Sequence, residues 1–204
     1  MSIQNNTPIT ILVLAHTYSE KILSCLNSVR WANEVILVFS GHTNQDEWKC
    51  LENKYNNVCC VFLDAEVTDF SEVRNTALTF ATHEWVFFLD SDEVVSKNVE
   101  HDLQEKITDD VQGITILRRD IFLEKELHWG EVRHDEILRI FRKDSGRYSG
   151  SVHERVHVNG NIVRSDIILY HYAHDSLESF LRKIIFYSQI EARTRSTHQK
   201  DISA

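Results

Sequence analysis

The residues best suited to chemistry stand in one short run, Trp85-Val86-Phe87-Phe88-Leu89-Asp90-Ser91-Asp92-Glu93. Its five large apolar residues predict a strand that is buried on both faces, as in a parallel sheet. In open α/β sheets, ligands bind at the carboxyl ends of the strands, which is where Asp90 and Asp92 fall. Two aspartates one residue apart form a hard-oxygen site suited to Mg²⁺ or Mn²⁺, and such an ion most often carries a phosphate. The alternative is that these polar residues only form a turn or cap the next helix.

A further candidate carboxylate is Glu154, within the expected strand at residues 152–158. Alternation along that strand puts Glu154 on the same face as Val156 and Val158. A carboxylate on an apolar face is costly unless it has a partner or a task. The sequence leaves two interpretations open, a catalytic base and a structural ion pair with an arginine.

Three basic or titratable candidates come from the later strands. His171 lies near the end of an expected strand, where its imidazole could complete a metal shell begun by Asp92. The alternative is a half-buried, hydrogen-bonded histidine. Arg139 and Arg142 point to opposite faces of the expected strand at residues 136–142. One of them could hold a diphosphate in a bidentate manner, and the alternative is a solvated surface position.

The elements that must position these residues alternate between strands and helices in the first half of the chain. Apolar runs and apolar stripes predict strands at residues 9–15, 34–39, 58–63 and 85–89, and helices at residues 20–31, 45–55 and 69–82. This order predicts a parallel sheet. Ser19 is the expected N-cap of the first helix.

The second half of the chain has a different character. Ser96 is expected to cap a helix at residues 97–107, which precedes shorter strands at residues 113–117, 136–142, 152–158 and 162–172. Asn159-Gly160 is the two-residue signal of a hairpin that joins the last two strands. An amphipathic helix at residues 176–195 closes the chain.

Composition and missing motifs exclude several classes of protein. The chain has 204 residues, which fits one domain, and its net charge of -9 argues against a nucleic-acid binder. There is no G-x-G-x-x-G and no P-loop sequence, which argues against a dinucleotide enzyme and a P-loop ATPase. No apolar stretch is long enough to span a bilayer, and the polar start does not fit a secretory signal. A cytoplasmic location is therefore expected.

The order and spacing of the motifs resemble the GT-A-fold, family 2 glycosyltransferases, within them most closely the bacterial group that adds glucose or related sugars to the lipopolysaccharide core. The resemblance covers about residues 9–187 and rests on these motifs: Trp31-Ala32-Asn33-Glu34-Val35, Ser40-Gly41-His42-Thr43, Arg74-Asn75, Asp90-Ser91-Asp92-Glu93, Leu138-Arg139-Ile140-Phe141-Arg142, Val152-His153-Glu154 and Leu169-Tyr170-His171-Tyr172. It implies an α/β, Rossmann-like GT-A fold, a mixed and mainly parallel sheet flanked by helices. One domain would occupy residues 1–204, with a nucleotide-sugar-binding half at residues 9–95 and an acceptor-side half with the C-terminal helix at residues 96–195.

The resemblance also implies a reaction and its residues. The reaction would be an inverting, metal-dependent transfer of sugar from a nucleotide sugar to an acceptor hydroxyl, in lipopolysaccharide-type glycan synthesis. Asp92, Asp90 and His171 would hold Mn²⁺ or Mg²⁺. Glu154 would be the base, with Glu93 as second choice. The donor contacts would come from Ala15, Thr17, Phe39, Arg74, Asp90, Ser91 and Arg139.

The resemblance leaves the partners less defined. A UDP-sugar is favoured as donor, and the acceptor is expected to be a saccharide or a lipid-linked glycan. The C-terminal helix could lie on the inner face of the cell membrane through its basic residues, and the alternative is that it covers the sheet.

Three departures from the family pattern leave base recognition open. Phe39 stands where an aspartate usually recognises the base, Asn44-Gln45 replaces Asp-Gly, and Thr17-Tyr18 replaces Asn-Glu. One alternative is therefore a non-catalytic member of the fold that binds a sugar nucleotide or a partner protein. The other is a haloacid dehalogenase-type phosphatase, whose Asp-x-Asp-x-Val signature fits residues 90–94. That class also needs a later strand ending in paired aspartates, whereas Asp109-Asp110 follows an expected helix.

Overall fold

The computed structural model describes residues 7–16, 18–41, 45–63, 69–97, 99–127, 135–150 and 154–174, with residues 176–178, 180, 181 and 185 beyond them. The helices are α1 (Lys21–Ser28), α2 (Gln45–Lys54), α3 (Phe70–Phe80) and α4 (Val99–Lys106). The strands are β1 (Ile9–Ala15), β2 (Glu34–Ser40), β3 (Val58–Leu63), β4 (Trp85–Asp90), β5 (Glu93–Val95), β6 (Val111–Phe122), β7 (Lys125–Glu126), β8 (Asp135–Arg142), β9 (Gly146–Ser149), β10 (Arg155–Val158) and β11 (Asn161–His174).

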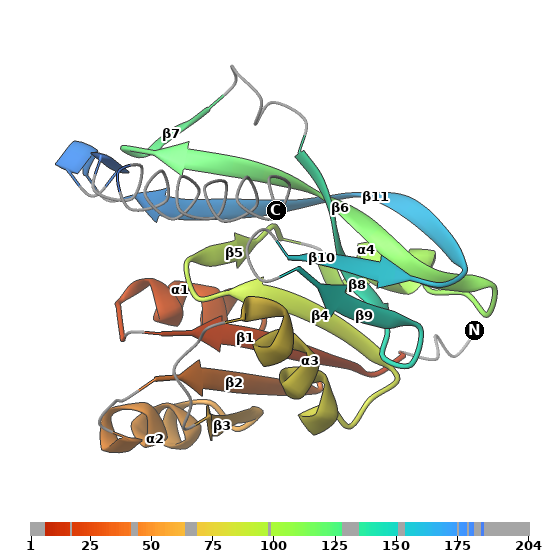
Figure 1. The fold of residues 1–204 in the computed structure, drawn as a ribbon, viewed down its shortest axis with the longest axis horizontal. Coiled ribbons are helices and arrows are strands. Elements are labelled where there is room, and N and C mark those ends of the chain that lie inside the picture. The colour runs from red at the N-terminus through yellow and green to blue at the C-terminus, as the bar shows by residue number, and fades with distance from the viewer. Residues whose placement is uncertain are drawn as a thin grey trace, which may run out of the picture.

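One mixed sheet runs through the molecule and takes strands from both halves of the chain (Figure 1). In the described residues it has nine strands, in the order β3-β2-β1-β4-β8-β6-β11-β5 with β7 beside β6. β9 and β10 form a separate two-stranded sheet. The α/β class and the mixed, largely parallel sheet predicted from the sequence are thus confirmed.

The four parallel strands β1 to β4 form as predicted because each is a continuous apolar run. β1 is buried along its whole length, and only the last residue of β4 is partly exposed. The chain passes from β1 to β2 on one side and from β3 to β4 on the other, so the strand order reverses between β1 and β4. Ligands of open α/β sheets bind at the carboxyl ends of the strands beside such a reversal. Asp90 lies there, opposite Leu14 of β1.

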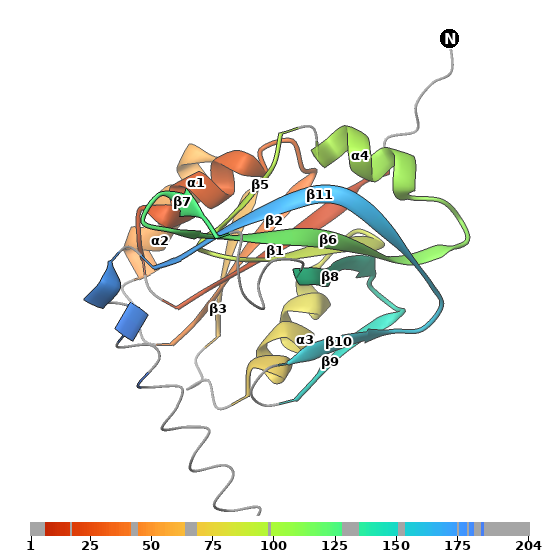
Figure 2. The same cartoon turned by 90° about the horizontal axis from the view of Figure 1, so that it is seen from above.

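Two apolar cores lie on the two faces of the sheet, and alternate side chains of β1 point into one core or the other. Ile11 and Val13 pack into the core that contains the buried residues of α1, α2 and α4, whereas Leu12 and Leu14 pack into the core beneath α3. Figure 2 shows α1, α2 and α4 on one side of the sheet, and α3 with β9 and β10 on the other. The two helix layers therefore hold the carboxyl edge of the sheet from both faces.

The predicted hairpin at Asn159-Gly160 is wrong. β10 pairs antiparallel with β9, whereas β11 pairs in parallel with β6 and antiparallel with β5. Gly160 has a φ of +125°, and a Cβ there would collide with the side chain of Gln112, so the position favours glycine. The chain does turn at Asn159-Gly160, but it passes there from β10 in the small sheet to β11 in the main sheet.

Neither expected serine caps its helix. Glu20 is the residue before α1, and it makes no side-chain cap hydrogen bond. Ser96 instead receives a hydrogen bond from the backbone N–H of Ile168 at 3.3 Å, and α4 begins later, at Val99. Ser96 therefore stabilises the pairing of β5 with β11.

Asp69 is the N-cap of α3, and replacing it with alanine is expected to lower the thermal unfolding midpoint by about 2–4 °C at pH 7. Its carboxylate accepts hydrogen bonds from Ser71 N at 2.7 Å and Glu72 N at 3.3 Å. The side-chain hydrogen bond from Ser71, assisted by these backbone bonds, lowers the pKa of Asp69. The stabilisation is therefore present above the unfolded pKa of about 3.9 and is lost as pH falls through the lower folded value. Thermal unfolding followed by circular dichroism between pH 7 and pH 3 should show the difference shrinking, and a constant difference would contradict the capping account.

The C-terminal helix falls only partly within the described residues. Leu177, Glu178, Phe180, Leu181 and Ile185 are helical, and Phe180 packs against Phe122 of β6 with ring centroids 5.4 Å apart. The rest of the helix expected at residues 176–195 lies outside the described residues, so its relation to a membrane stays a prediction. Within the described part of the chain, no helix has the length and apolar character needed to cross a membrane.

Candidate functional site

The acidic run after β4 is divided among three environments at the carboxyl edge of the sheet. Asp90 ends β4, Ser91 and Asp92 form a turn, and Glu93 begins β5. The backbone N–H of Ser91 donates to the carbonyl of Leu14 at 3.0 Å, which ties the turn to the end of β1. Each carboxylate consequently has its own set of partners.

Asp90 points into a buried cluster with two arginines. Its Oδ1 accepts a hydrogen bond from Arg74 at 2.8 Å and its Oδ2 accepts one from Arg139 at 3.2 Å. Burial alone would raise the pKa of Asp90, but the two guanidinium groups outweigh it and hold the pKa well below its usual value. Asp90 is therefore ionised and held by both arginines at once.

Glu93 is enclosed beneath this cluster, with 0% of its surface exposed. Its Oε2 accepts a hydrogen bond from the backbone N–H of Asp90 at 2.8 Å, and its Oε1 accepts one from Arg139 at 3.4 Å. Burial raises the pKa of Glu93, and Arg139 opposes that rise. Both carboxylate oxygens are thus engaged in positioning the end of β4.

Glu154 completes the cluster from the small sheet, just before β10. Its Oε1 accepts a hydrogen bond from Arg74 Nε at 2.9 Å, so the predicted ion pair is present. The side chain is 17% exposed, and its Oε2 makes no hydrogen bond to the residues that the structure describes. The ion pair and a role as base are therefore compatible, because the pair uses one oxygen and leaves the other available.

Arg74, which the family resemblance predicted to contact the nucleotide-sugar donor, is buried, with only 5% of its surface exposed. It comes from α3, and its guanidinium lies over the rings of Phe88 and Tyr148, at 5.7 and 5.3 Å from their centroids. From there its fork bridges Asp90 and Glu154, which are 64 residues apart in the chain. Arg74 therefore holds two site carboxylates in place.

His171 lies close to Asp92 in the turn that follows β4. Pairing of β11 with β5 places His171 opposite Glu93, and its Nε2 lies 3.7 Å from Asp92 Oδ1. Its Nδ1 makes a 2.6 Å hydrogen bond with Asp120 of β6. Burial alone would lower the pKa of His171, but the hydrogen bond to Asp120 and the charge of Asp92 raise it overall.

The donor set around Asp92 fits a divalent cation that shares its shell with phosphate. Among the residues described, no three His, Cys, Asp or Glu side chains converge as metal ligands. Asp92 and His171 are nevertheless adjacent, and Mg²⁺ is commonly held by one or two protein ligands plus water and substrate phosphates. Asp120 orients the imidazole as outer partners of metal-bound histidines do. Asp90 faces away toward the arginines and does not join this pair.

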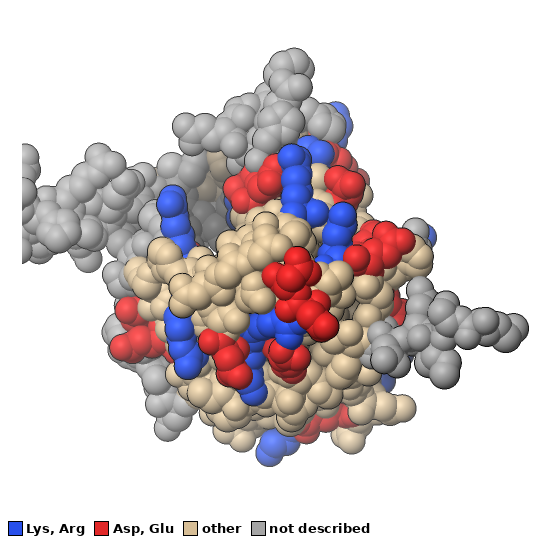
Figure 3. All heavy atoms as spheres, turned by 90° about the vertical axis from the view of Figure 1, so that its right-hand side faces the viewer, with Lys and Arg blue, Asp and Glu red and all other residues tan. Residues whose placement is uncertain are grey.

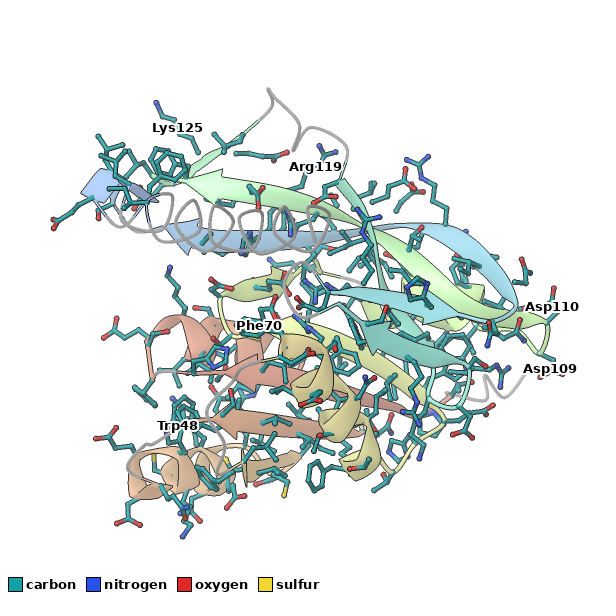
Figure 4. The ribbon with its side chains drawn as sticks, viewed as in Figure 1. Trp48, Phe70, Asp109, Asp110, Arg119 and Lys125 are labelled. Atoms are coloured by element: carbon teal, nitrogen blue, oxygen red, sulfur yellow. The ribbon has the colours of Figure 1, made fainter. Side chains whose placement is uncertain are left out.

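Of the residues near β1 and β2 that were expected to contact the donor, two are buried and one lies outside the described residues. Ala15 is buried at the end of β1, and Thr17 lies outside the described residues. Phe39 is 2% exposed and packs against Trp48 of α2, with ring centroids 4.7 Å apart. Trp48 is labelled in Figure 4. The side chain of Phe39 thus belongs to the core.

Exposed rings occupy the same edge and were not identified from the sequence. His16 follows β1, contacts Ser40 Oγ through Nδ1 at 2.8 Å, and lies edge-on to Phe70 at 5.6 Å. Phe70, labelled in Figure 4, begins α3 and is partly exposed, as is Tyr18. Aromatic faces of this kind can stack on any nucleobase, whichever hydrogen-bonding groups that base carries.

A cavity of about 440 Å³ opens beside Glu154, between β8 and β10. Arg139, Tyr148 and Arg155 contribute to its walls. Neither the cavity nor the role of Tyr148 had a signal in the sequence, because β9 was not predicted as a strand and its pairing with β10 is set by the fold.

One observation argues against the phosphatase alternative, and a second concerns nucleic-acid binding. Asp109 and Asp110 stand in the turn before β6, as Figure 4 shows, and do not follow a strand as the phosphatase interpretation requires. On the face drawn in Figure 3, acidic and basic side chains are interspersed and do not gather into a basic patch. This charge pattern gives no support to nucleic-acid binding.

Comparison with known proteins places these features in a family context. Residues 10–185 match the family model described as glycosyl transferase family 2. Over 101 residues the chain is 32% identical to the SPbeta prophage-derived glycosyltransferase SunS of Bacillus subtilis (strain 168), covering 46% of this chain and 22% of that protein. Over 161 residues it is 25% identical to the lipopolysaccharide core biosynthesis glycosyltransferase LpsC of Rhizobium meliloti (strain 1021), covering 76% and 59%. The chain thus spans less than two thirds of the length of either relative.

Solved structures show the same fold at low sequence identity. The structure of S. aureus TarS 1-349 in complex with UDP-GlcNAc matches with a TM-score of 0.60 and 16% identity, covering 85% of this chain and 60% of that one. The structure of GalNAc-T7 with UDP, GalNAc and Mn²⁺ matches with a TM-score of 0.66 and 11% identity, covering 82% and 44%. These likenesses establish the GT-A architecture of the chain.

Proposed function

Because this chain belongs to glycosyl transferase family 2, we propose that it transfers a sugar from a nucleotide-sugar donor to an acceptor hydroxyl, with inversion at the anomeric carbon. The observation that carries this proposal is the arrangement at one sheet edge. Asp92 and His171 lie 3.7 Å apart on one side of the turn after β4, and Glu154 lies across the Arg74–Asp90 bridge on the other.

Asp92 and His171 are proposed to hold Mn²⁺ or Mg²⁺ together with the donor diphosphate. The bound ion would neutralise the charge that develops on the leaving diphosphate. Asp120 keeps the Nε2 of His171 directed toward Asp92. We assign Asp90 to holding Arg74 and Arg139, since both of its oxygens are committed to them.

Glu154 is proposed as the base, in preference to Glu93. Its available oxygen would accept the proton of the acceptor hydroxyl, whose oxygen attacks the anomeric carbon as the bond to the diphosphate breaks. Glu93 has no exposed surface and both of its oxygens are hydrogen-bonded, so it has no path to an acceptor.

The donor is proposed to be a UDP-sugar, which is supported by the UDP-GlcNAc and UDP complexes of TarS and GalNAc-T7. Stacking on the exposed rings of Phe70 or Tyr18 would replace the base contact expected at Phe39, which is buried. A role in lipopolysaccharide-type glycan synthesis is supported by the likeness to LpsC. The cytoplasmic location expected from the sequence stays a prediction.

The proposal is tested by measuring nucleoside diphosphate release from UDP-glucose, UDP-GlcNAc, UDP-galactose and GDP-mannose, with Mn²⁺, Mg²⁺ or chelator. Release that requires the metal is expected with at least one UDP-sugar. Metal-dependent donor binding without release, even when saccharide acceptors are supplied, would favour a non-catalytic member of the fold. Neither binding nor release with any donor would contradict the proposal.

Replacing Asp120 with asparagine is expected to weaken metal affinity by about 10–100-fold, because the amide keeps a hydrogen bond to His171 but removes the charge that makes the imidazole a stronger ligand. The measurement is the Mn²⁺ concentration that gives half-maximal diphosphate release. Asp144→Asn, at an exposed turn, is the matched control. An unchanged Mn²⁺ requirement in Asp120→Asn would show that His171 is not a ligand.

A further inference from the structure

The cavity beside Glu154 gathers the unsatisfied hydrogen-bond donors of the described chain. Three buried polar side-chain atoms have no hydrogen-bond partner among the described residues: Arg74 Nη1, Arg118 Nε and Tyr148 Oη. Arg118 and Tyr148 line the cavity, and Arg74 lies behind it, bonded to Glu154. Buried polar groups are rarely left unpaired, so three around one cavity point to a missing partner.

All three atoms can donate a hydrogen bond. Guanidinium nitrogens are donors only, and a buried tyrosine hydroxyl donates readily. Arg118 Nε forms an ion pair with Asp120, whose Oδ1 lies 3.6 Å away, but it makes no hydrogen bond in the described chain. Tyr148 is 6% exposed, and its ring packs edge-on against Phe88 at 4.9 Å, which fixes the position of the hydroxyl. A ligand that pairs with these atoms would present acceptor oxygens to them.

The acidic residues of the cavity are already paired. Asp135 bonds Arg118 at 2.7 Å, Glu136 bonds Arg164 at 2.8 Å, and Glu154 bonds Arg74 at 2.9 Å. Arg155 is exposed at the wall of the cavity and makes no ion pair with the residues that the structure describes. Among the charged side chains that line the cavity, Arg155 is thus the one without an ion pair in the described chain, and it is a cation.

We propose that this cavity is the acceptor subsite and that it takes a saccharide bearing an anionic group, a carboxylate or a phosphate. The unpaired Arg155 would bind the anion, Arg118 would add a hydrogen bond from its Nε, and Tyr148 would donate to an oxygen of the sugar in the cavity that Glu154 also lines. The volume of about 440 Å³ lies within the range of small-molecule sites. The acceptor role rests on the proposed glycosyl transfer, whereas binding of the acidic sugar does not.

The test measures ligand binding without donor or metal, so it is independent of turnover. The probes are methyl β-D-glucuronide against methyl β-D-glucoside, and glucose 6-phosphate against glucose, by saturation-transfer NMR and calorimetry. At least one acidic sugar is expected to bind tenfold or more tightly than its neutral counterpart. The arm that shows the preference distinguishes a carboxylate-bearing from a phosphate-bearing acceptor.

Variants locate the binding. Arg155→Ala should reduce binding of the acidic sugar about tenfold, whereas Arg147→Ala, an exposed arginine on the neighbouring β9, should not. Tyr148→Phe should weaken binding at least threefold while leaving the thermal midpoint unchanged or higher, because it removes a hydroxyl that has no partner. Equal binding of acidic and neutral sugars, or acidic-sugar binding that Arg155→Ala and Tyr148→Phe leave intact, would overturn the proposal. If diphosphate release is also absent while the acidic sugar binds, the proposed function fails and this inference stands as a binding site alone.

Discussion

Replacing Glu154 with glutamine is expected to slow sugar transfer by about 10²–10⁴-fold while leaving donor affinity unchanged. The amide oxygen can still accept the hydrogen bond that Arg74 Nε gives to Glu154 at 2.9 Å, so the local structure should persist. What is lost is the capacity to take the acceptor proton. The measurement is the rate of transfer to an accepted saccharide, with donor affinity determined by calorimetry.

Two comparisons sharpen this test. Glu72→Gln alters an exposed glutamate on α3, the helix that carries Arg74, and should transfer at the wild-type rate. Glu93→Gln should disturb the arginine cluster and lower stability, because Glu93 is fully buried with both oxygens bonded. Full transfer activity in Glu154→Gln would show that the base lies elsewhere.

Arg74→Gln is expected to lower the free energy of unfolding by about 3–5 kcal/mol and to abolish most of the transfer activity. The substitution leaves Glu154 without its partner and removes one of the two arginines that hold Asp90. Lysine should not rescue it, because a single ammonium cannot reproduce the fork that spans both carboxylates. Urea denaturation gives the stability change.

The control for that experiment is Arg147→Gln, which removes an exposed arginine on β9 and should change the free energy of unfolding by less than about 0.5 kcal/mol. A similar small change in Arg74→Gln would mean that the bridge between α3, β4 and the small sheet contributes little. The site would then be positioned by the main sheet alone.

The parallel half of the fold could be predicted because each of its strands is a continuous apolar run. In β1, β2 and β4 that pattern goes with burial on both faces, whereas β3, at the edge of the sheet, is only partly buried. The same reasoning explains Phe39, since a residue inside such a strand belongs to the core. The family pattern suggested a donor contact at that position, and the structure places the side chain against Trp48 instead.

The second half could be predicted only in outline, because its pairings join distant segments. The turn at Asn159-Gly160 is visible locally, but whether β10 pairs with β9 or with β11 depends on surfaces elsewhere in the fold. The same limit applies to side chains. Spacing indicated that Glu154 needed a partner, yet nothing near it in the sequence could identify Arg74, 80 residues away.

The measurement that tests the central claim most directly is calorimetric binding of UDP in the presence and absence of Mn²⁺. The claim is that Asp92 and His171 form a cation site that carries the donor diphosphate. Wild-type protein should bind UDP with a strong Mn²⁺ requirement, Asp92→Asn should lose that requirement and bind weakly, and Asp109→Asn, in the exposed turn before β6, should match the wild type. Mn²⁺-dependent UDP binding that survives in Asp92→Asn would contradict the account.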